Sequence, residues 1–211
     1  MIKAIIFDRD GVLVDSEAVH VQSFEVAFKE FGINLNIQDK EWIAGRRPEE
    51  HLPILNDKYN VSYEDIRKIQ RPKFDELFET VAFFHDTINL LKKAHSKGLR
   101  IALATSSNKV STDLLLSKLG IKELFSVVTT HEDCTKCKPD PEPYLLTAHK
   151  LELKPEECLV IEDSGPGLQS AKAAGMKCIV IYNEYTKNHD FSKADKVVAS
   201  AKDLNFRELF R

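Results

Sequence analysis

The spacing of hydrophobic residues changes twice along this 211-residue chain and divides it into three stretches. An apolar run over residues 2–7 opens the chain and has the composition of a buried strand. Over residues 16–80 the apolar residues recur at three- and four-residue steps, which is the helical period. From about residue 87 onward, short β-branched runs alternate with helical patterns, so the chain changes structural class after the helical stretch.

The alternating stretch predicts a series of strand–helix units. Strands are expected over residues 100–104, 125–129, 158–161, 177–182 and 196–198. Helices are expected over residues 87–97 (with Asp86 as N-cap), 109–119, 142–151, 167–174 and 204–210. Strands that alternate with helices of this length imply right-handed βαβ units. We therefore predict an α/β fold with a doubly wound, mostly parallel, Rossmann-like sheet.

The helical stretch predicts an insertion without strands. Its first helix has one apolar face, formed by Val21, Phe24, Ala27, Phe28 and Phe31. Further apolar positions include Trp42 and Ile54, and Pro72 is expected to kink or restart the last helix. We therefore expect an α/β core from residues 1–15 and 81–211, and an all-helical inserted domain from residues 16–80.

Composition and charge narrow the class of protein. The chain is 43% hydrophobic and 30% charged, as globular proteins are. Its net charge of -3 provides no basic surface for nucleic acid or for anionic membranes. No apolar stretch approaches the length of a membrane span, and the opening strand leaves no room for a signal peptide. We expect a cytoplasmic protein, monomeric by default, without nucleic-acid or membrane partners.

Polar residues follow the expected strands where each strand ends. The carboxyl ends of parallel strands meet at one edge of the sheet, where α/β proteins bind ligands. The residues are Asp8 and Asp10, then Thr105, Ser106, Ser107 and Asn108, then Lys138, and finally Glu162, Asp163 and Ser164. Carboxylates suit a hard cation such as Mg²⁺, whereas a lysine, hydroxyls and helix N-termini suit phosphate oxygens.

The first two of these acids, Asp8 and Asp10, stand one residue apart. If the strand continues through Arg9, both carboxylates face one point and Arg9 faces away. Two carboxylates that close need a cation between them, or one must keep its proton. The alternative is that Asp10 and Gly11 form only a polar turn.

Taken together, these motifs resemble a known family. Phe7-Asp8-Arg9-Asp10-Gly11-Val12-Leu13, Thr105, Lys138-Pro139-Asp140 and Glu162-Asp163-Ser164 resemble the four ordered motifs of the haloacid dehalogenase-like hydrolases. The helical stretch resembles the cap of the subgroup that contains β-phosphoglucomutase, phosphoglycolate phosphatase and small sugar phosphatases. The resemblance implies a Mg²⁺-dependent phosphatase that acts on a small phosphorylated metabolite, such as a sugar phosphate, through an aspartyl-phosphate.

The resemblance also implies a role for each motif residue. Asp8 is the nucleophile, and Asp10 protonates the leaving group and then takes a proton from water. The residues expected to bind the phosphoryl group are Thr105, Ser106, Ser107, Asn108 and Lys138. The residues expected to hold Mg²⁺ are Asp8, Asp10 (through its backbone carbonyl), Glu162 (directly or through water) and Asp163.

The expected cap departs from the mutase pattern. Arg46 and Arg47 precede Pro48, where mutase-like relatives carry an arginine. They either bind a second phosphate or form a solvated pair at a helix start. His20 is either a polar substrate contact near the hinge or a helix-surface histidine. A phosphomutase is therefore the alternative to a phosphatase, and a non-catalytic metabolite-binding protein is a third hypothesis.

Cys134 and Cys137 form a Cys-x-x-Cys pair with His131 nearby. A structural zinc site needs four ligands, and no second pair stands at a suitable spacing. The alternative is that the two thiols form a redox-active pair. We expect neither function, and we expect Cys158 and Cys178 to be core thiols.

Overall fold

The computed structural model describes residues 1–44, 46 and 48–206, and the chain folds into two compact units. The core unit comprises Met1–Leu13, Phe84–Asn183 and His189–Arg211. The helical unit comprises Val14–Phe83 and Glu184–Asn188. The segment Glu184–Asn188, which the sequence pattern assigns to the core, groups instead with the helical unit.

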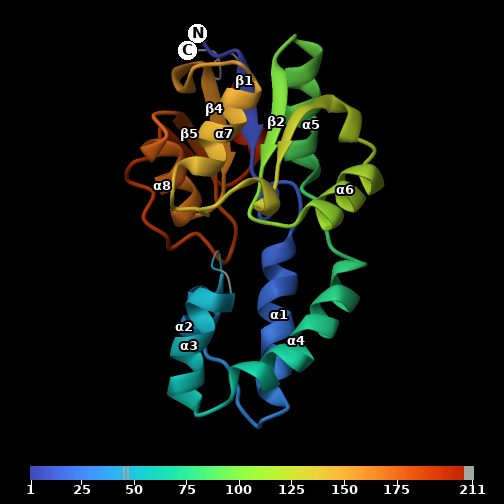
Figure 1. The fold of residues 1–211 in the computed structure, drawn as a ribbon, viewed down its shortest axis with the longest axis vertical. Coiled ribbons are helices and arrows are strands. Elements are labelled where there is room, and N and C mark those ends of the chain that lie inside the picture. Colours follow the sequence, from blue (N-terminus) through green and yellow to red (C-terminus); the bar gives the residue numbers. More distant parts are fainter. Residues whose placement is uncertain (45, 47, 207–211) are drawn as a thin grey trace. The chain divides into compact units, whose positions relative to one another are not determined.

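The core unit contains a six-stranded parallel sheet (Figure 1). Its strands are β1 (Ala4–Phe7), β2 (Arg100–Ala104), β3 (Phe125–Thr129), β4 (Cys158–Glu162), β5 (Lys177–Ile181) and β6 (Lys196–Val198). Their spatial order is β3-β2-β1-β4-β5-β6, so the direction of winding reverses between β1 and β4. Phe7 is level with Leu103 of β2 and Ile161 of β4, which brings the ends of all three strands together. The predicted doubly wound α/β fold is confirmed.

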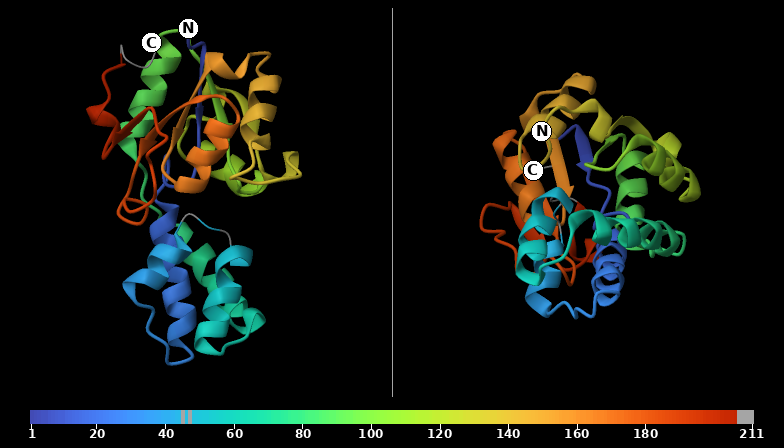
Figure 2. Two further views of the ribbon diagram at one scale, coloured as in Figure 1. Left: turned by 90° about the vertical axis from the view of Figure 1, so that its left-hand side faces the viewer. Right: turned by 60° about the horizontal axis from the view of Figure 1, so that its bottom comes forward.

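Helices cover both faces of this sheet. They are α5 (His85–Ser96), α6 (Lys109–Lys118), α7 (Glu142–Lys150) and α8 (Gly165–Ala173), with short 3-10 turns at Lys122–Leu124, His131–Asp133, Pro155–Glu157 and Ala201–Asp203. Ala4 and Ile6 of β1 lie in one buried cluster with residues of α7 and α8. Helix α5 lies on the opposite face (Figure 2). None of the helices in the described ranges is long and apolar enough to cross a membrane.

Two details at the helix ends of the core unit differ from expectation. Asp86 is not an N-cap, because α5 begins at His85, and its cap residue Phe84 makes no side-chain capping bond. The Asp86 carboxylate instead accepts a hydrogen bond from Ser200 and pairs with Lys202 at 3.1 Å. The expected helix 204–210 falls largely outside the described residues, and Leu204 and Asn205 are not helical.

The helical unit contains α1 (Ser16–Lys29), α2 (Ile37–Ile43), α3 (Pro48–Tyr59) and α4 (Tyr63–Phe78). Its core is formed by Val21, Phe24, Ala27, Phe28, Leu35, Ile43, Ala44, Leu52, Leu55 and Ile66. Phe31 is outside that core and 42% exposed, because it lies beyond the end of α1. Helix α4 continues through Pro72 as a single helix, so the expected restart does not occur.

The segment Glu184–Asn188 contributes to the packing of the helical unit. Tyr185 packs against the helical core, and Thr186 is fully buried. The Asn188 side-chain amide donates to Oε1 of Glu41 at 2.7 Å. A loop that follows β5 in sequence therefore completes a unit made mostly of residues 14–83.

Candidate active site

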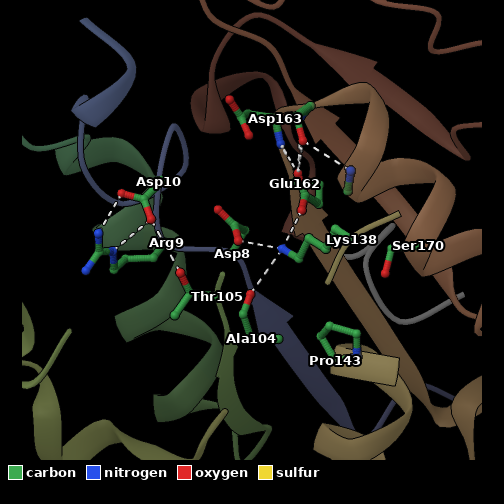
Figure 3. Close-up of polar contacts among 12 residues, drawn as sticks. Asp8, Arg9, Asp10, Ala104, Thr105, Lys138, Pro143, Glu162, Asp163 and Ser170 are labelled. Atoms are coloured by element: carbon green, nitrogen blue, oxygen red, sulfur yellow. Dashed lines mark hydrogen bonds and ion pairs between the residues drawn. The ribbon is translucent and has the colours of Figure 1, made fainter. Parts of the chain in front are cut away.

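Lys138 lies where the carboxyl ends of the central strands meet (Figure 3). Its ammonium donates to Oδ1 of Asp8 at 2.5 Å, to Oε1 of Glu162 at 2.7 Å and to the Ala104 carbonyl at 3.1 Å. These partners follow or end β1, β4 and β2 respectively. The ammonium also lies 4.7 Å from the ring centre of Tyr144. A buried lysine therefore links the first and fourth motifs.

Both carboxylate oxygens of Glu162 are engaged. Oε1 accepts from Lys138 and from the Tyr144 hydroxyl, which is also 2.7 Å away. Oε2 accepts from the Asp163 N–H, the Ser164 N–H and the Ser164 hydroxyl, at 2.9, 3.1 and 3.1 Å. A Cβ on Gly167 would lie 1.8 Å from Oε1, so the start of α8 packs directly against the carboxylate. Glu162 is thus fixed from both sides.

One lysine between two buried carboxylates leaves an excess negative charge. Burial raises the pKa of Asp8 to about 7, and the neighbouring acids Glu162 and Asp10 add to this, although Lys138 opposes it. Burial also acts to raise the pKa of Glu162, but Lys138 and the hydrogen bonds outweigh it and lower that pKa. For Lys138, burial favours the neutral amine, yet Asp8 and Glu162 raise its pKa overall. The excess negative charge therefore disfavours the ionised form of Asp8 rather than that of Glu162.

The Asp10 carboxylate is turned toward Arg9 rather than toward Asp8 (Figure 3). Nε and Nη2 of Arg9 each donate to a separate Asp10 oxygen at 2.9 Å. The hydroxyls of Ser107 and Thr105 donate to Asp10 Oδ2 at 2.7 and 3.3 Å. Asp8 and Asp10 were expected to face one point only if the strand continued through Arg9. That condition is not met, because β1 ends at Phe7 and the strand alternation ends with it.

Asp163 is positioned by two residues from other segments. The Asn183 amide donates to Oδ2 of Asp163 at 2.8 Å. Gly11 has a φ of +77°, and a Cβ there would lie 2.0 Å from the same oxygen. Sequence reasoning missed Asn183, Arg9 and Tyr144. For Asn183 a signal was available, since it follows β5 at the same edge of the sheet.

In the loop after β2, some side chains bind Asp10 and another caps the next helix. Thr105 and Ser107 turn toward Asp10, and the Ser107 N–H also donates to Oγ1 of Thr105 at 3.0 Å. Asn108 instead caps α6, because its Oδ1 accepts from the Ser111 N–H at 2.8 Å. Ser106 is half-buried between them. The N-termini of α6 and α8 both open near this loop edge, and Ser164 caps α8.

The remaining candidate residues belong to the helical unit. The Arg46 guanidinium lies 4.1 Å from the ring centre of Trp42 and donates to the Trp42 carbonyl at 3.0 Å. His20 packs its ring edge-to-face against Phe24 and His51. Arg47 lies outside the described residues.

The four cysteines are unbridged. The Cys137 sulfur lies 3.5 Å from Nδ1 of His131, and burial raises the pKa of Cys134 to about 11. A thiol that resists ionisation is a poor nucleophile and a poor metal ligand. Cys158 and Cys178 are buried in β4 and β5, which confirms their prediction as core thiols.

The doubly wound fold, with four polar motifs at one edge of its sheet, is typical of a class of hydrolases. Residues 5–181 match the family model described as haloacid dehalogenase-like hydrolase, and the chain belongs to this family. It is a phosphoric monoester hydrolase of that family, and its relatives include a putative phosphatase and a phosphorylated carbohydrates phosphatase.

Relatives and solved structures resemble the chain over most of its length. It is 34% identical to the putative phosphatase YhcW of Bacillus subtilis over 97% of the chain and 94% of that protein. It is 32% identical to a phosphorylated carbohydrates phosphatase of Thermotoga maritima, covering 84% and 83%. The structure of CbbY from Rhodobacter sphaeroides with xylulose-(1,5)bisphosphate superposes with a TM-score of 0.80 at 26% identity, covering 97% of both chains.

Proposed function

We propose that the chain is a Mg²⁺-dependent phosphatase that hydrolyses a small sugar phosphate through an aspartyl-phosphate on Asp8. The observation that carries the proposal is the Asp8–Lys138–Glu162 arrangement at the point where the sheet reverses direction. Glu162 is held by several donors, whereas among the described residues only Lys138 donates to the Asp8 carboxylate. Asp8 is therefore the carboxylate of the pair that is suited to attack.

Each residue of the site has its own role in the proposed hydrolysis. Asp8 attacks phosphorus, while Lys138 offsets the charge that gathers around the carboxylate and the phosphoryl oxygens. Thr105, Ser107 and the N–H groups at the start of α6 hold the phosphoryl oxygens. Asp10 protonates the departing alkoxide and then takes a proton from the water that cleaves the aspartyl-phosphate.

The oxygen donors at this edge suit a hard cation. No three acidic, histidine or cysteine side chains within the described ranges already form a metal cage. Asp8 and Asp163, with the Asp10 backbone carbonyl, would hold Mg²⁺, and such a small protein ligand set is typical of Mg²⁺ with a phosphate substrate. The bound ion would neutralise the excess negative charge on Asp8. We assign Glu162 to orienting Lys138, because both of its oxygens are engaged.

We propose that the helical unit acts as a cap that selects the leaving group. A mutase needs a second phosphate clamp, for which Arg46 was one candidate. The Arg46 guanidinium stacks on Trp42 and binds the backbone at the end of α2. This placement supports hydrolysis over a phosphomutase reaction.

The decisive experiment compares the wild type with Asp8→Asn across a panel of sugar phosphates, with and without Mg²⁺. The wild type should release phosphate only with Mg²⁺, and Asp8→Asn should lose activity by about a thousandfold or more. Asp57→Asn, an exposed acid of the helical unit, is the matched control. An active Asp8→Asn variant would refute the aspartyl-phosphate. If the wild type hydrolyses no phosphate ester, the phosphatase proposal fails and the metabolite-binding hypothesis is favoured.

A second assay separates the phosphatase from the mutase. The enzyme is incubated with β-glucose 1-phosphate and a trace of the bisphosphate, and both products are measured. Release of free phosphate supports the proposal. Conversion to glucose 6-phosphate without free phosphate would contradict it.

A further inference from the structure

The ion pair between Arg9 and Asp10 has no part in the mechanism above. Arg9 is only 3% exposed, although it carries a full charge. Its guanidinium binds both oxygens of Asp10 in the fork geometry that gives the strongest carboxylate pairs. A mechanism that uses Asp10 must therefore account for Arg9.

Arg9 is also held from its other side by α6. Nη1 donates to the hydroxyls of Ser111 and Thr112 at 3.0 and 3.2 Å. Those hydroxyls in turn donate to the Asn108 carbonyl at 3.2 and 2.8 Å. The guanidinium is thus also anchored to the first turn of α6, by bonds that do not involve Asp10.

A bound substrate would affect some of the hydrogen bonds to the Asp10 carboxylate and not others. The hydroxyls of Thr105 and Ser107 would turn to the phosphoryl oxygens when a phosphate ester binds, which removes two donors from Asp10. The two bonds from Arg9 remain. Both hold the carboxylate on the side away from Asp8 (Figure 3). Asp10 cannot approach a leaving group beside Asp8 while both are intact.

We propose that Arg9 is a positioning residue that holds Asp10 in a resting position, from which Asp10 must be released to protonate the leaving group. The inference rests on the proposed function, because it concerns the acid of that reaction. The resting and released positions of Asp10 form a two-state equilibrium that Arg9 biases toward rest. Arg9 acts only through Asp10 and takes no part itself in the making or breaking of bonds.

The test is a double-mutant cycle on kcat/KM with Arg9→Leu, Asp10→Asn and the double variant. Each enzyme is assayed with an alkyl phosphate, whose leaving group needs an acid, and with p-nitrophenyl phosphate, whose leaving group does not. Arg9→Leu should raise kcat/KM for the alkyl phosphate about three- to tenfold, through kcat rather than KM. In the Asp10→Asn background, and with p-nitrophenyl phosphate, it should change kcat/KM by less than about twofold.

Three outcomes would overturn the proposal. If Arg9→Leu lowers kcat/KM both with Asp10 and with Asp10→Asn, then the role of Arg9 is to support the first turn of α6. A fall confined to enzymes that retain Asp10 would show that Arg9 orients Asp10 productively. No change would show that the pair does not limit the reaction. If Asp10→Asn alone has no effect on the alkyl phosphate, then the proposed acid role fails, which is a separate result.

Two further variants guard against a folding artefact. Arg9→Lys keeps the charge but loses the fork, so kcat/KM should lie between the wild type and Arg9→Leu. Arg100→Leu removes an arginine at the start of β2, where its guanidinium binds the Leu151 carbonyl, and should leave kcat/KM unchanged. Thermal unfolding of every variant shows whether it is folded. If Arg9→Leu does not fold, Arg9→Lys carries the test, and kcat/KM equal to that of the wild type would contradict the proposal.

Discussion

The Tyr144 hydroxyl donates a 2.7 Å hydrogen bond to Oε1 of Glu162, the same oxygen that accepts the Lys138 ammonium. Burial also raises the pKa of Tyr144 well above its usual value, so this hydroxyl keeps its proton and donates. Tyr144 therefore takes part in fixing the acceptor that orients Lys138. It comes from α7, whose Ala148 lies in the same buried cluster as strands of the sheet.

Tyr144→Phe should lower both stability and turnover. The variant keeps the ring but leaves Glu162 with one donor fewer, which costs about 1 kcal/mol of unfolding free energy. Turnover should fall several-fold, since Lys138 is held less firmly against Asp8. Urea unfolding and steady-state kinetics measure the two effects. Tyr63→Phe, which removes a hydroxyl bonded to Glu49 in the helical unit, should leave turnover unchanged. Unaltered kinetics in Tyr144→Phe would show that Lys138 is positioned without it.

Gly167→Ala tests the close packing of α8 on Glu162. The added Cβ would lie 1.8 Å from Oε1 of Glu162, so the carboxylate or the helix must shift. We expect a loss of about 2 kcal/mol in unfolding free energy and a large loss of activity. Gly165→Ala is the matched control at the same helix start, because its Cβ would meet His189 at an ordinary 3.6 Å. Equal behaviour of the two variants in thermal unfolding and activity assays would rule out the steric argument.

The sequence was sufficient to predict most of the sheet and its ligand edge. Parallel strands buried on both faces are continuous apolar runs, and the polar residues that end them are therefore conspicuous. The pairing of Arg9 with Asp10 was not predictable in this way, because strand alternation applies only while the strand lasts. Whether β1 ended at Phe7 or continued could not be read from residue types.

The helical unit was less predictable for a related reason. Helical periodicity identifies which residues face a core but not what covers that core. The segment Glu184–Asn188 joins the unit from a distant part of the chain, and its few residues have no period. Likewise, the stacking of Arg46 on Trp42 depends on the end of α2, which residue types locate only approximately.

Asn183→Leu should weaken Mg²⁺ binding without removing a ligand. The Asn183 amide donates to Oδ2 of Asp163 at 2.8 Å and so orients a proposed metal ligand. Loss of such an outer partner lowers metal affinity about tenfold. The Mg²⁺ concentration that gives half-maximal activity measures the effect. Asn188→Leu removes a similar amide–carboxylate bond, to Glu41 in the helical unit, and should leave that concentration unchanged. An unchanged Mg²⁺ requirement in Asn183→Leu would remove Asp163 or its orientation from the metal site.

His51 should make the helical unit sensitive to acid. Its side chain is fully buried with its ring edge-to-face against Phe24, and neither ring nitrogen has a hydrogen-bond partner within the described part of the chain. Burial lowers the pKa of His51 to about 2, and the charges of His20, Arg67 and Arg46 act in the same direction. The neutral imidazole is therefore the form that the folded unit accommodates.

The sign of the pH effect follows from this lowered pKa. Below the ordinary pKa of about 6.5, the unfolded chain takes up a proton at His51 that the folded chain refuses. The free energy of unfolding should therefore fall as pH decreases from about 6.5, by roughly 1 kcal/mol per pH unit from this residue. In His51→Leu that slope should be smaller, and stability at pH 7 should rise because no polar ring is buried. Urea unfolding between pH 7.5 and 4.5 tests this, with the exposed His95→Gln as control. If His51→Leu and the wild type lose stability in parallel, then His51 is not the group that takes up the proton.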